Sequence, residues 1–289
     1  MESKSRSAVR IRPKGRTGVA SSHGHRIVVF TALDGTLLDS RTFEAGANRA
    51  MIQQLRAANI PVVPVSVMTL DEIAPIASEL GLQQAMIIEA GGAIARWNGE
   101  GWDVEACAPA AETLLDVVNR IEDRSGANLL VYSAMDESAA ALASGRSGQM
   151  LHASTHRCYS EPFIIESGEL ASIRRAAAEI GFSVRRGRRF FHLCRECDEG
   201  EAFARIRDEL QCDIAIAVGG SAVDAEFLTR ADVAIVVPGS DGRPDPQLLE
   251  KLRSARVAPS PAPDGWAAAV DEALRALATP KRRARRIAS

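Results

Sequence analysis

From Ile27 onward, short apolar runs rich in β-branched residues alternate with segments whose apolar residues recur at helical spacing. The run "IVVFTAL" (27–33) predicts a strand, and residues 43–55 then follow the helical period. "PVVPVS" (61–66), a helical segment over 70–80 and "AMII" (85–88) repeat this order. Such alternation is typical of a parallel sheet covered by helices on both faces. We therefore predict an α/β fold with a Rossmann-like, doubly wound parallel sheet.

The middle of the chain departs from this alternation. "NGEG" (98–101) contains an Asn-Gly pair that favours a tight hairpin turn, so residues 93–105 are expected to form antiparallel strands. Strands such as "EPFIIE" (161–166) and helices near 110–124 and 169–180 follow. Two strand and helix units of this kind indicate an α+β module inserted into the first fold.

The first pattern is expected to resume near Phe190 with the strand "FFHLC". "IAIAV" (214–218), "VAIVV" (233–237) and a closing helix near 265–277 continue it. We therefore predict that the chain has four parts. These are a basic, disordered tail at 1–26, a core of 27–95 and 188–277, an inserted cap domain at 96–187, and a second basic tail at 278–289.

Composition restricts the class of protein. Apolar residues make up 46% of the 289 residues and charged residues 25%, which are globular values. No apolar run approaches the roughly 20 residues of a membrane helix, so no membrane span is expected. Five cysteines, an odd number without a signal-peptide pattern, favour a reducing compartment, and we predict a cytoplasmic protein.

The two ends of the chain are basic although the net charge is −2. Residues 1–26 hold seven Lys or Arg against one Glu, and residues 278–289 hold five Lys or Arg. Solubilising tails, an organelle transit peptide at the N-terminus, and contact with nucleic acid or an anionic surface all fit this pattern. A nucleic-acid partner is not expected on this evidence alone.

Ligands of open α/β sheets bind beyond the carboxyl ends of the strands. Four turns follow predicted strands in this way, and we expect them to face one crevice: residues 32–36, 66–69, 89–92 and 219–224.

At these turns the sequence resembles a known family. "FTALDGTLLD", "PVSVMT", "CDEGEA" and "VGGSAVD" are similar, in order and spacing, to the four motifs of the haloacid dehalogenase superfamily. "CYSEPF" (158–163) and "GRRFFHL" (187–193) more narrowly resemble mannosyl-3-phosphoglycerate phosphatase and its relatives. The resemblance implies the fold of a phosphoric monoester hydrolase with an inserted cap domain.

The resemblance also implies roles for individual residues of the first two motifs. The family's nucleophilic Asp, which forms an aspartyl-phosphate, corresponds to Ala32. Asp34 matches the general acid and base, and Ser66 matches the hydroxyl that binds a phosphoryl oxygen. Asp34 can equally hydrogen-bond its own turn, and Ser66 can serve only as a turn residue.

The later motifs depart further from the family pattern. Glu199 stands at the position of the lysine that neutralises the phosphate, and Gly220 stands where the first metal-binding Asp is usual. Asp224 matches the remaining metal acid, although an Asp at a helix start is favoured without any metal. With Asp34 and Asp224 as the only carboxylates, binding of the family's Mg²⁺ is expected to be weak or absent. Ala90 replaces an Asn that is frequent in the family.

Several cap residues are candidates for binding the substrate. Arg188 and Arg189 lie in a basic run that is either a solvated surface or a grip for a carboxylate or phosphate, since guanidinium binds such groups bidentately. Tyr159, Ser160 and Glu161 lie on the narrower cap motif and are expected to face the substrate.

Two hypotheses of function follow. The first is a pseudoenzyme that lacks the nucleophile, the motif-three lysine and the first metal acid, and that binds a phosphorylated sugar or glycerate, or a protein partner. The alternative is an active Mg²⁺-dependent phosphatase that releases mannosylglycerate and phosphate through a rearranged site around Asp34. A third class, in which the basic tails tether an inert core, stays open.

Overall fold

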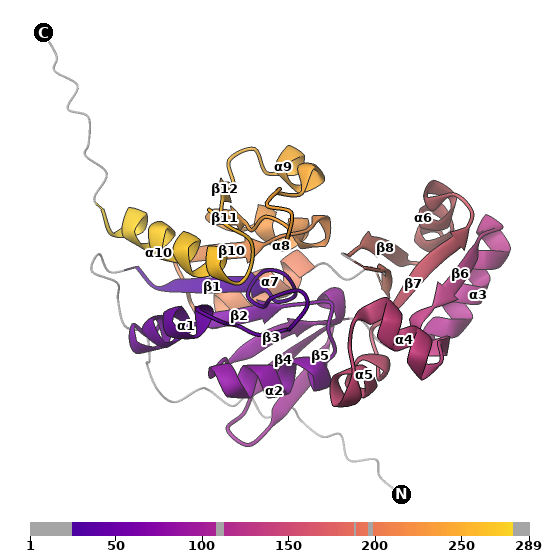
Figure 1. The fold of residues 1–289 in the computed structure, drawn as a ribbon, viewed down its shortest axis with the longest axis horizontal. Coiled ribbons are helices and arrows are strands. Elements are labelled where there is room, and N and C mark those ends of the chain that lie inside the picture. The colour runs from indigo at the N-terminus through magenta and orange to yellow at the C-terminus, as the bar shows by residue number, and fades with distance from the viewer. Residues whose placement is uncertain (1–24, 108–112, 188, 196–198, 280–289) are drawn as a thin grey trace, which may run out of the picture.

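The structure is a computed structural model that describes residues 25–107, 113–187, 189–195 and 199–279. It contains two β-sheets, each with its own helices (Figure 1). We call the larger sheet and its helices the core, and we call the second sheet with its helices, from residue 113 to residue 195, the cap segment.

The core sheet has eight strands in the order β12-β11-β10-β1-β2-β3-β4-β5. The strands from β12 to β3 are parallel, and β4 and β5 add an antiparallel hairpin. Their bounds are Ile27–Ala32 (β1), Val62–Val65 (β2), Ala85–Ile88 (β3), Ala93–Trp97 (β4), Trp102–Ala106 (β5), Ile214–Gly219 (β10), Val233–Val236 (β11) and Arg256–Val257 (β12). The predicted α/β class and parallel sheet are confirmed.

Strand β1 lies at the centre of this sheet, and all six of its residues are buried. Val29 packs into the apolar cluster on one face, while Val28 and Phe30 pack into the cluster on the other. The indole of Trp266 donates a hydrogen bond to the Thr31 hydroxyl at 2.8 Å. Burial on both faces explains why this strand reads as a continuous apolar run rather than an alternating one.

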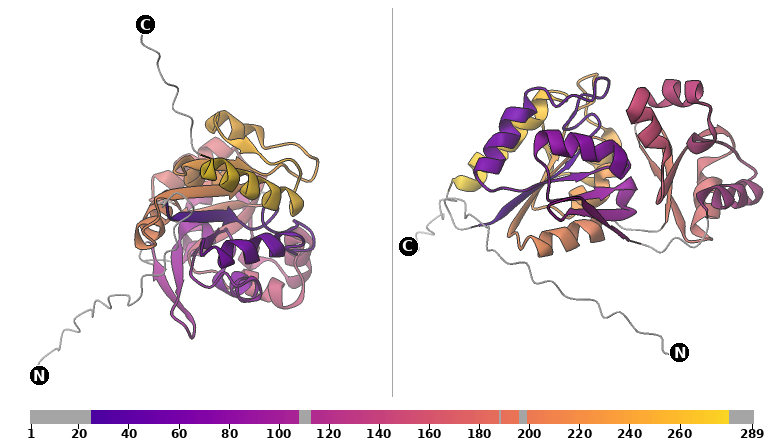
Figure 2. Two further views of the ribbon diagram at one scale, coloured as in Figure 1. Left: turned by 90° about the vertical axis from the view of Figure 1, so that its left-hand side faces the viewer. Right: turned by 90° about the horizontal axis from the view of Figure 1, so that it is seen from below.

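Helices cover both faces of the core sheet, as the two views of Figure 2 show. Helices α1 (Asn48–Ala57), α2 (Leu70–Leu80) and α10 (Asp264–Ala278) contribute to the cluster that contains Val29. The opposite cluster takes side chains from α7 (Glu199–Glu209), α8 (Ala225–Thr229) and α9 (Pro246–Lys251). The carboxyl ends of β10, β1 and β2 are thereby left side by side at one edge of the sheet.

The cap segment holds a four-stranded antiparallel sheet in the order β6-β7-β9-β8. Its elements are α3 (Leu114–Ser125), β6 (Asn128–Val131), α4 (Glu137–Ser144), α5 (Gly148–Thr155), β7 (Ser160–Ser167), α6 (Leu170–Ala178), β8 (Phe182–Arg186) and β9 (Phe191–Arg195). Helices α3 and α6 pack on one face, against residues such as Phe163 and Leu193. Since side chains alternate along a strand, the neighbouring Pro162 and His192 point to the opposite face.

Two strands belong to a different sheet from the one that the sequence suggested. "FFHLC" was expected to return to the core, but β9 pairs with β7 and β8 in the cap segment. Strand β5 falls inside the range predicted for the cap domain, yet it pairs with β4 at the edge of the core sheet. Apolar periodicity identifies a strand, but it does not specify the partners with which that strand pairs.

Several short helices and one short strand were not predicted from the sequence. The Ser-, Gly- and Ala-rich stretch near 138–148 folds into α4 and the start of α5, and the Asp136 side chain caps α4 by accepting from the Ala139 amide. The edge strand β12 and helix α9 were likewise not anticipated. Among the described residues, no helix is long and apolar enough to cross a membrane.

Candidate functional site

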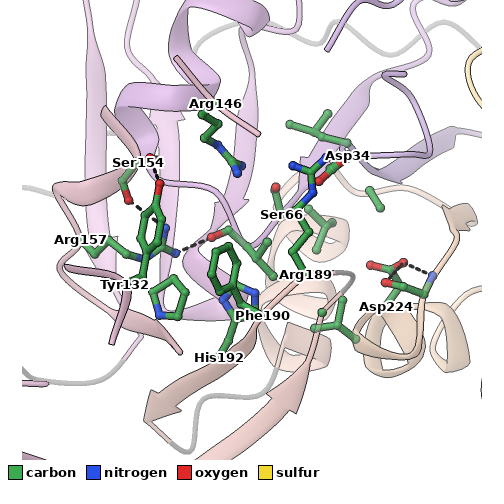
Figure 3. Close-up of a pocket in the computed structure, with 18 residues that line it drawn as sticks. Asp34, Ser66, Tyr132, Arg146, Ser154, Arg157, Arg189, Phe190, His192 and Asp224 are labelled. Atoms are coloured by element: carbon green, nitrogen blue, oxygen red, sulfur yellow. Dashed lines mark hydrogen bonds between the residues drawn. The ribbon is translucent and has the colours of Figure 1, made fainter. Parts of the chain in front are cut away.

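Three of the four predicted turns meet at one pocket. Ala32 ends β1, Asp34 follows in the next turn, Ser66 follows β2, and Asp224 lies in the short 3-10 turn after β10; all four line the pocket (Figure 3). The fourth turn, residues 89–92, is not part of the lining. The pocket therefore opens at the carboxyl ends of adjacent parallel strands, where α/β folds bind their ligands.

The cap segment forms the opposite wall of this pocket. About 670 Å³ of atom-free space, part of it open to solvent, lies between the two walls. The cap residues that line it are Tyr132, Arg146, Ser154, Arg157, Pro162, Gly187, Arg189, Phe190 and His192.

Asp224 is held by its own turn. Its Oδ2 atom accepts hydrogen bonds from the amides of Gly220 and Ser221, both at 2.8 Å, and from the Ser221 hydroxyl at 3.2 Å. This arrangement is a capping interaction at the start of the helical segment that leads into α8. The alternative interpretation of Asp224 as a helix-start carboxylate therefore has direct structural support.

The acidic residues present do not fit the family's metal site. Ala32 and Gly220 offer no side-chain oxygen, and one oxygen of Asp224 is already occupied by three donors. Within the described ranges, no group of three or more His, Cys, Asp or Glu side chains could hold a metal ion. Mg²⁺ demands near-octahedral oxygen coordination, usually anchored by one or two carboxylates.

The Ser66 side chain forms a hydrogen bond within its own turn and also faces the pocket. Its Oγ accepts a hydrogen bond from the Met68 amide at 3.1 Å, so it shapes the turn between β2 and α2. The same side chain lines the pocket. Both interpretations that the sequence allowed for this residue are thus compatible with its position.

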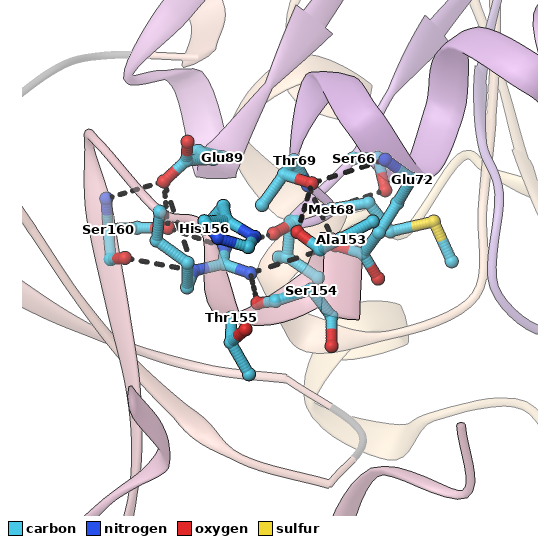
Figure 4. A network of polar contacts seen from close by, with 12 residues as sticks. Ser66, Met68, Thr69, Glu72, Glu89, Ala153, Ser154, Thr155, His156 and Ser160 are labelled. Atoms are coloured by element: carbon cyan, nitrogen blue, oxygen red, sulfur yellow. Dashed lines mark hydrogen bonds and ion pairs between the residues drawn. The ribbon is translucent and has the colours of Figure 1, made fainter. Parts of the chain in front are cut away.

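A buried glutamate at the start of α2 joins the core to the cap segment. Glu72 completes a capping box with Thr69, accepting from the Thr69 amide at 2.9 Å through Oε2 (Figure 4). Its Oε1 accepts from Nε of Arg146 at 2.5 Å, and its Oε2 lies 3.8 Å from Nη1 of Arg157. The Glu72 side chain therefore caps the N-terminus of a core helix and also contacts two arginines of the cap segment.

A second buried glutamate makes a similar connection. Glu89 accepts from the Ser160 amide at 2.9 Å (Figure 4). It also accepts from the Tyr159 amide at 2.9 Å and from the Cys158 amide. Arg157 lies beside it, with Nε 3.8 Å from Oε2. The backbone here is left-handed, with φ of 47° at Glu89 and 59° at Ala90. Asn tolerates this conformation better than Ala, which explains why Asn suits this position in the family.

Glu199, the residue at the position of the family's lysine, does not line the pocket. It is buried at the start of α7, and its Oε1 lies 3.5 Å from Nη1 of Arg185 on β8. Arg185 also pairs with Glu226 at 2.9 Å and donates to the Ala90 carbonyl at 2.9 Å. The reversed charge at residue 199 is therefore matched by an arginine from the cap segment.

The predicted substrate-binding residues divide into two groups. Arg189 lines the pocket, whereas Arg188 lies outside the described residues. Tyr159, Ser160 and Glu161 are not in the pocket lining: the Tyr159 Cβ packs against Gly92, Ser160 binds Glu89, and Glu161 accepts from the Ser133 amide at 3.0 Å. Burial raises the pKa of the Glu161 carboxyl. Contact of these three residues with substrate stays a prediction.

His192 is a pocket residue that the sequence analysis did not identify. It is 4% exposed, and its Nδ1 has no hydrogen-bond partner within the described part of the chain. Burial, together with the charges of Arg157, Arg146 and Arg185, lowers its pKa to about 3. The imidazole is therefore neutral at physiological pH.

Arg146 and Arg157 were also missed. Arg146 lies between two short helices in a Ser-, Gly- and Ala-rich stretch without apolar periodicity, so nothing in the sequence marks it. Arg157 directly precedes the "CYSEPF" motif, and this adjacency was the one available signal. Contacts with Glu72 hold both arginine side chains at the pocket, although Glu72 lies about 80 residues away along the chain.

Comparisons with known proteins agree with this architecture. The sequence profile of haloacid dehalogenase-like hydrolases matches residues 29–156. A protein of Methanococcoides burtonii named glucosyl-3-phosphoglycerate/mannosyl-3-phosphoglycerate phosphatase is 25% identical over 257 residues, covering 83% of this chain and 94% of its own. A phosphatase of the same name from Persephonella marina is 24% identical, covering 73% and 85%.

Solved structures share the fold. A haloacid dehalogenase-like hydrolase from B. subtilis superimposes with a TM-score of 0.63 at 15% identity, covering 86% of this chain and 99% of the other. At this identity the likeness concerns the fold alone.

Proposed function

We propose that this chain, whose residues 29–156 match the haloacid dehalogenase-like hydrolases, keeps the ligand pocket of such proteins without phosphoryl transfer. In this proposal it binds a phosphorylated sugar or a phosphorylated glycerate. The observation that carries the proposal is the position of Ala32, which lies at the carboxyl end of the central strand and lines the pocket. A methyl group there cannot attack phosphorus.

The surroundings of Ala32 support the loss of catalysis. Asp34 remains beside it, but the acid and base of this family acts on an aspartyl-phosphate that cannot form here. Glu199 supplies a carboxylate instead of the lysine's positive charge, and this carboxylate is buried against Arg185. Asp224 is engaged by its own turn.

Other features support retention of binding. Ser66 places a hydroxyl on the core side, and arginines line the cap side. Tyr132 and Phe190 add an aromatic wall, with ring centroids 5.1 Å apart. A pocket with cations on one part of its wall and aromatic rings on another suits a ligand that combines an anionic group with a sugar ring. The names of the similar phosphatases, glucosyl- and mannosyl-3-phosphoglycerate, describe such molecules.

Titration calorimetry tests this proposal. Mannosyl-3-phosphoglycerate is expected to bind, and mannosylglycerate, which lacks the phosphate, is expected to bind at least about tenfold more weakly, since charge-assisted hydrogen bonds would be lost. Phosphate release is measured in the same samples. Turnover that disappears in Asp34→Asn would instead favour an active phosphatase with a site rebuilt around Asp34.

A further inference from the structure

We infer that Arg146 supplies the cation that binds the anionic group of the ligand, and that Glu72 positions it. This inference rests on the proposed function and adds the residue that replaces the missing motif-three lysine. The positive charge would then come from the cap segment rather than from the start of α7. Among the described residues, three arginines line the pocket: Arg146, Arg157 and Arg189.

Arg157 uses four of its five N–H donors in hydrogen bonds to the cap segment and the core, and its Nη1 also lies 3.8 Å from Oε2 of Glu72. Its Nε donates to the Ser160 carbonyl at 2.9 Å, its Nη1 to the Ser154 carbonyl at 3.4 Å, and its Nη2 to the Val67 carbonyl and the Ser160 hydroxyl. Its side chain is 4% exposed. Arg157 therefore fastens the cap segment to the turn after β2, and a ligand would have to break these bonds to engage it.

Arg189 is also committed to backbone groups. One terminal nitrogen donates to the Ser144 carbonyl and the other to the Ser40 carbonyl at 2.7 Å. The bond to Ser40 connects the cap segment with the loop that follows Asp34. Arg189 is exposed, and its guanidinium lies 6.0 Å from the centre of the Phe43 ring.

Arg146 differs from both. Of its side-chain nitrogens, only Nε makes a hydrogen bond to the described residues, to Glu72 Oε1, which leaves the two terminal nitrogens available. The side chain is only 10% exposed, and Figure 3 shows its guanidinium turned into the pocket. Two parallel N–H groups on one guanidinium match the oxygens of a phosphate or a carboxylate.

Two contacts hold this guanidinium in place before any ligand binds. Glu72 is itself fixed by the capping box of α2, so its carboxylate is a rigid anchor on the core side. The ring of Phe43 lies on another side, 5.3 Å from the Arg146 Cζ atom. Preorganisation of this kind lowers the entropic cost of binding. Arg146 would thus touch the ligand, and Glu72 would act through Arg146.

The test measures binding of mannosyl-3-phosphoglycerate and of inorganic phosphate by calorimetry. Arg146→Ala alone would leave Oε1 of the buried Glu72 carboxylate without its hydrogen-bond donor and could prevent folding. The double variant Glu72→Gln/Arg146→Met removes both charges, and near-UV circular dichroism checks its fold. Arg124→Ala serves as the matched control, because this cap arginine pairs with Glu179 at the surface.

We expect the double variant to bind either probe at least about tenfold more weakly than the wild type, and Arg124→Ala to stay within about twofold. Glu72→Gln alone is expected to weaken binding by a few fold without abolishing it. Wild-type affinity in the folded double variant would overturn the role of Arg146 while leaving the proposed function intact. A wild-type protein that binds neither probe would overturn both.

Discussion

Arg185 on β8 and Glu199 at the start of α7 face one another across the boundary between the cap segment and the core, with Nη1 3.5 Å from Oε1. Both side chains are at least nine-tenths buried. The carboxylate that stands where the resemblance implies a lysine is thus one half of an ion pair that fastens the cap segment.

Restoring the lysine should therefore destabilise the protein. Glu199→Lys would place a second cation beside Arg185, and breaking a buried ion pair typically costs about 3–5 kcal/mol. Urea unfolding measures the change. Glu179→Lys is the matched control: it reverses the charge of an exposed partner of Arg124, where little loss is expected. Equal stability of Glu199→Lys and the wild type would contradict the structural role of Glu199.

Protonation of His192 should contribute to acid unfolding. Its pKa falls from 6.5 to about 3 in the folded chain, mainly through burial. The folded state thus binds this proton less readily than the unfolded state, so the stability present above pH 6.5 is lost as the pH falls toward 3. The expected slope from one such group approaches about 1.4 kcal/mol per pH unit.

His192→Asn should flatten this part of the stability curve. Unfolding free energies measured between pH 7 and pH 4, roughly the window set by the linkage, check the effect. The same replacement at the exposed His156 controls for loss of an imidazole as such. An unchanged pH slope in His192→Asn would show that this group is not the one that titrates.

Asp224 should matter for stability and not for Mg²⁺ binding. Asp224→Asn weakens three hydrogen bonds to a charged acceptor, so a loss of about 1–3 kcal/mol is expected. Thermal unfolding with and without millimolar Mg²⁺ gives the measurement. We expect no Mg²⁺-dependent rise in the melting temperature of the wild type. A rise that Asp224→Asn abolishes would restore the metal-site interpretation.

Strand positions and the edge at which the pocket opens were predictable because local signals determine them. β1, β2 and β10 are buried parallel strands, and their apolar runs mark the turns that carry Asp34, Ser66 and Asp224. Parallel strands place such turns at one edge of a sheet. This part of the site followed from the sequence.

The cap side of the site depends on long-range pairing that no local pattern encodes. The apolar pattern of β9 fits a strand of either sheet. Its antiparallel pairing with β7 and β8 places it in the sheet of the cap segment. Arg146 gains its position from Glu72 and Phe43, which are distant in sequence. Tyr159, conversely, stands on a recognisable motif, yet it packs against Gly92 outside the pocket.

Phosphorus NMR of mannosyl-3-phosphoglycerate mixed with equimolar protein and Mg²⁺ distinguishes ligand binding from phosphoryl transfer, because one spectrum reports both binding and hydrolysis. We expect a phosphomonoester signal that shifts or broadens on addition of protein, with no inorganic phosphate appearing over hours. Inorganic phosphate that accumulates with the wild type and is absent with Asp34→Asn would contradict this expectation.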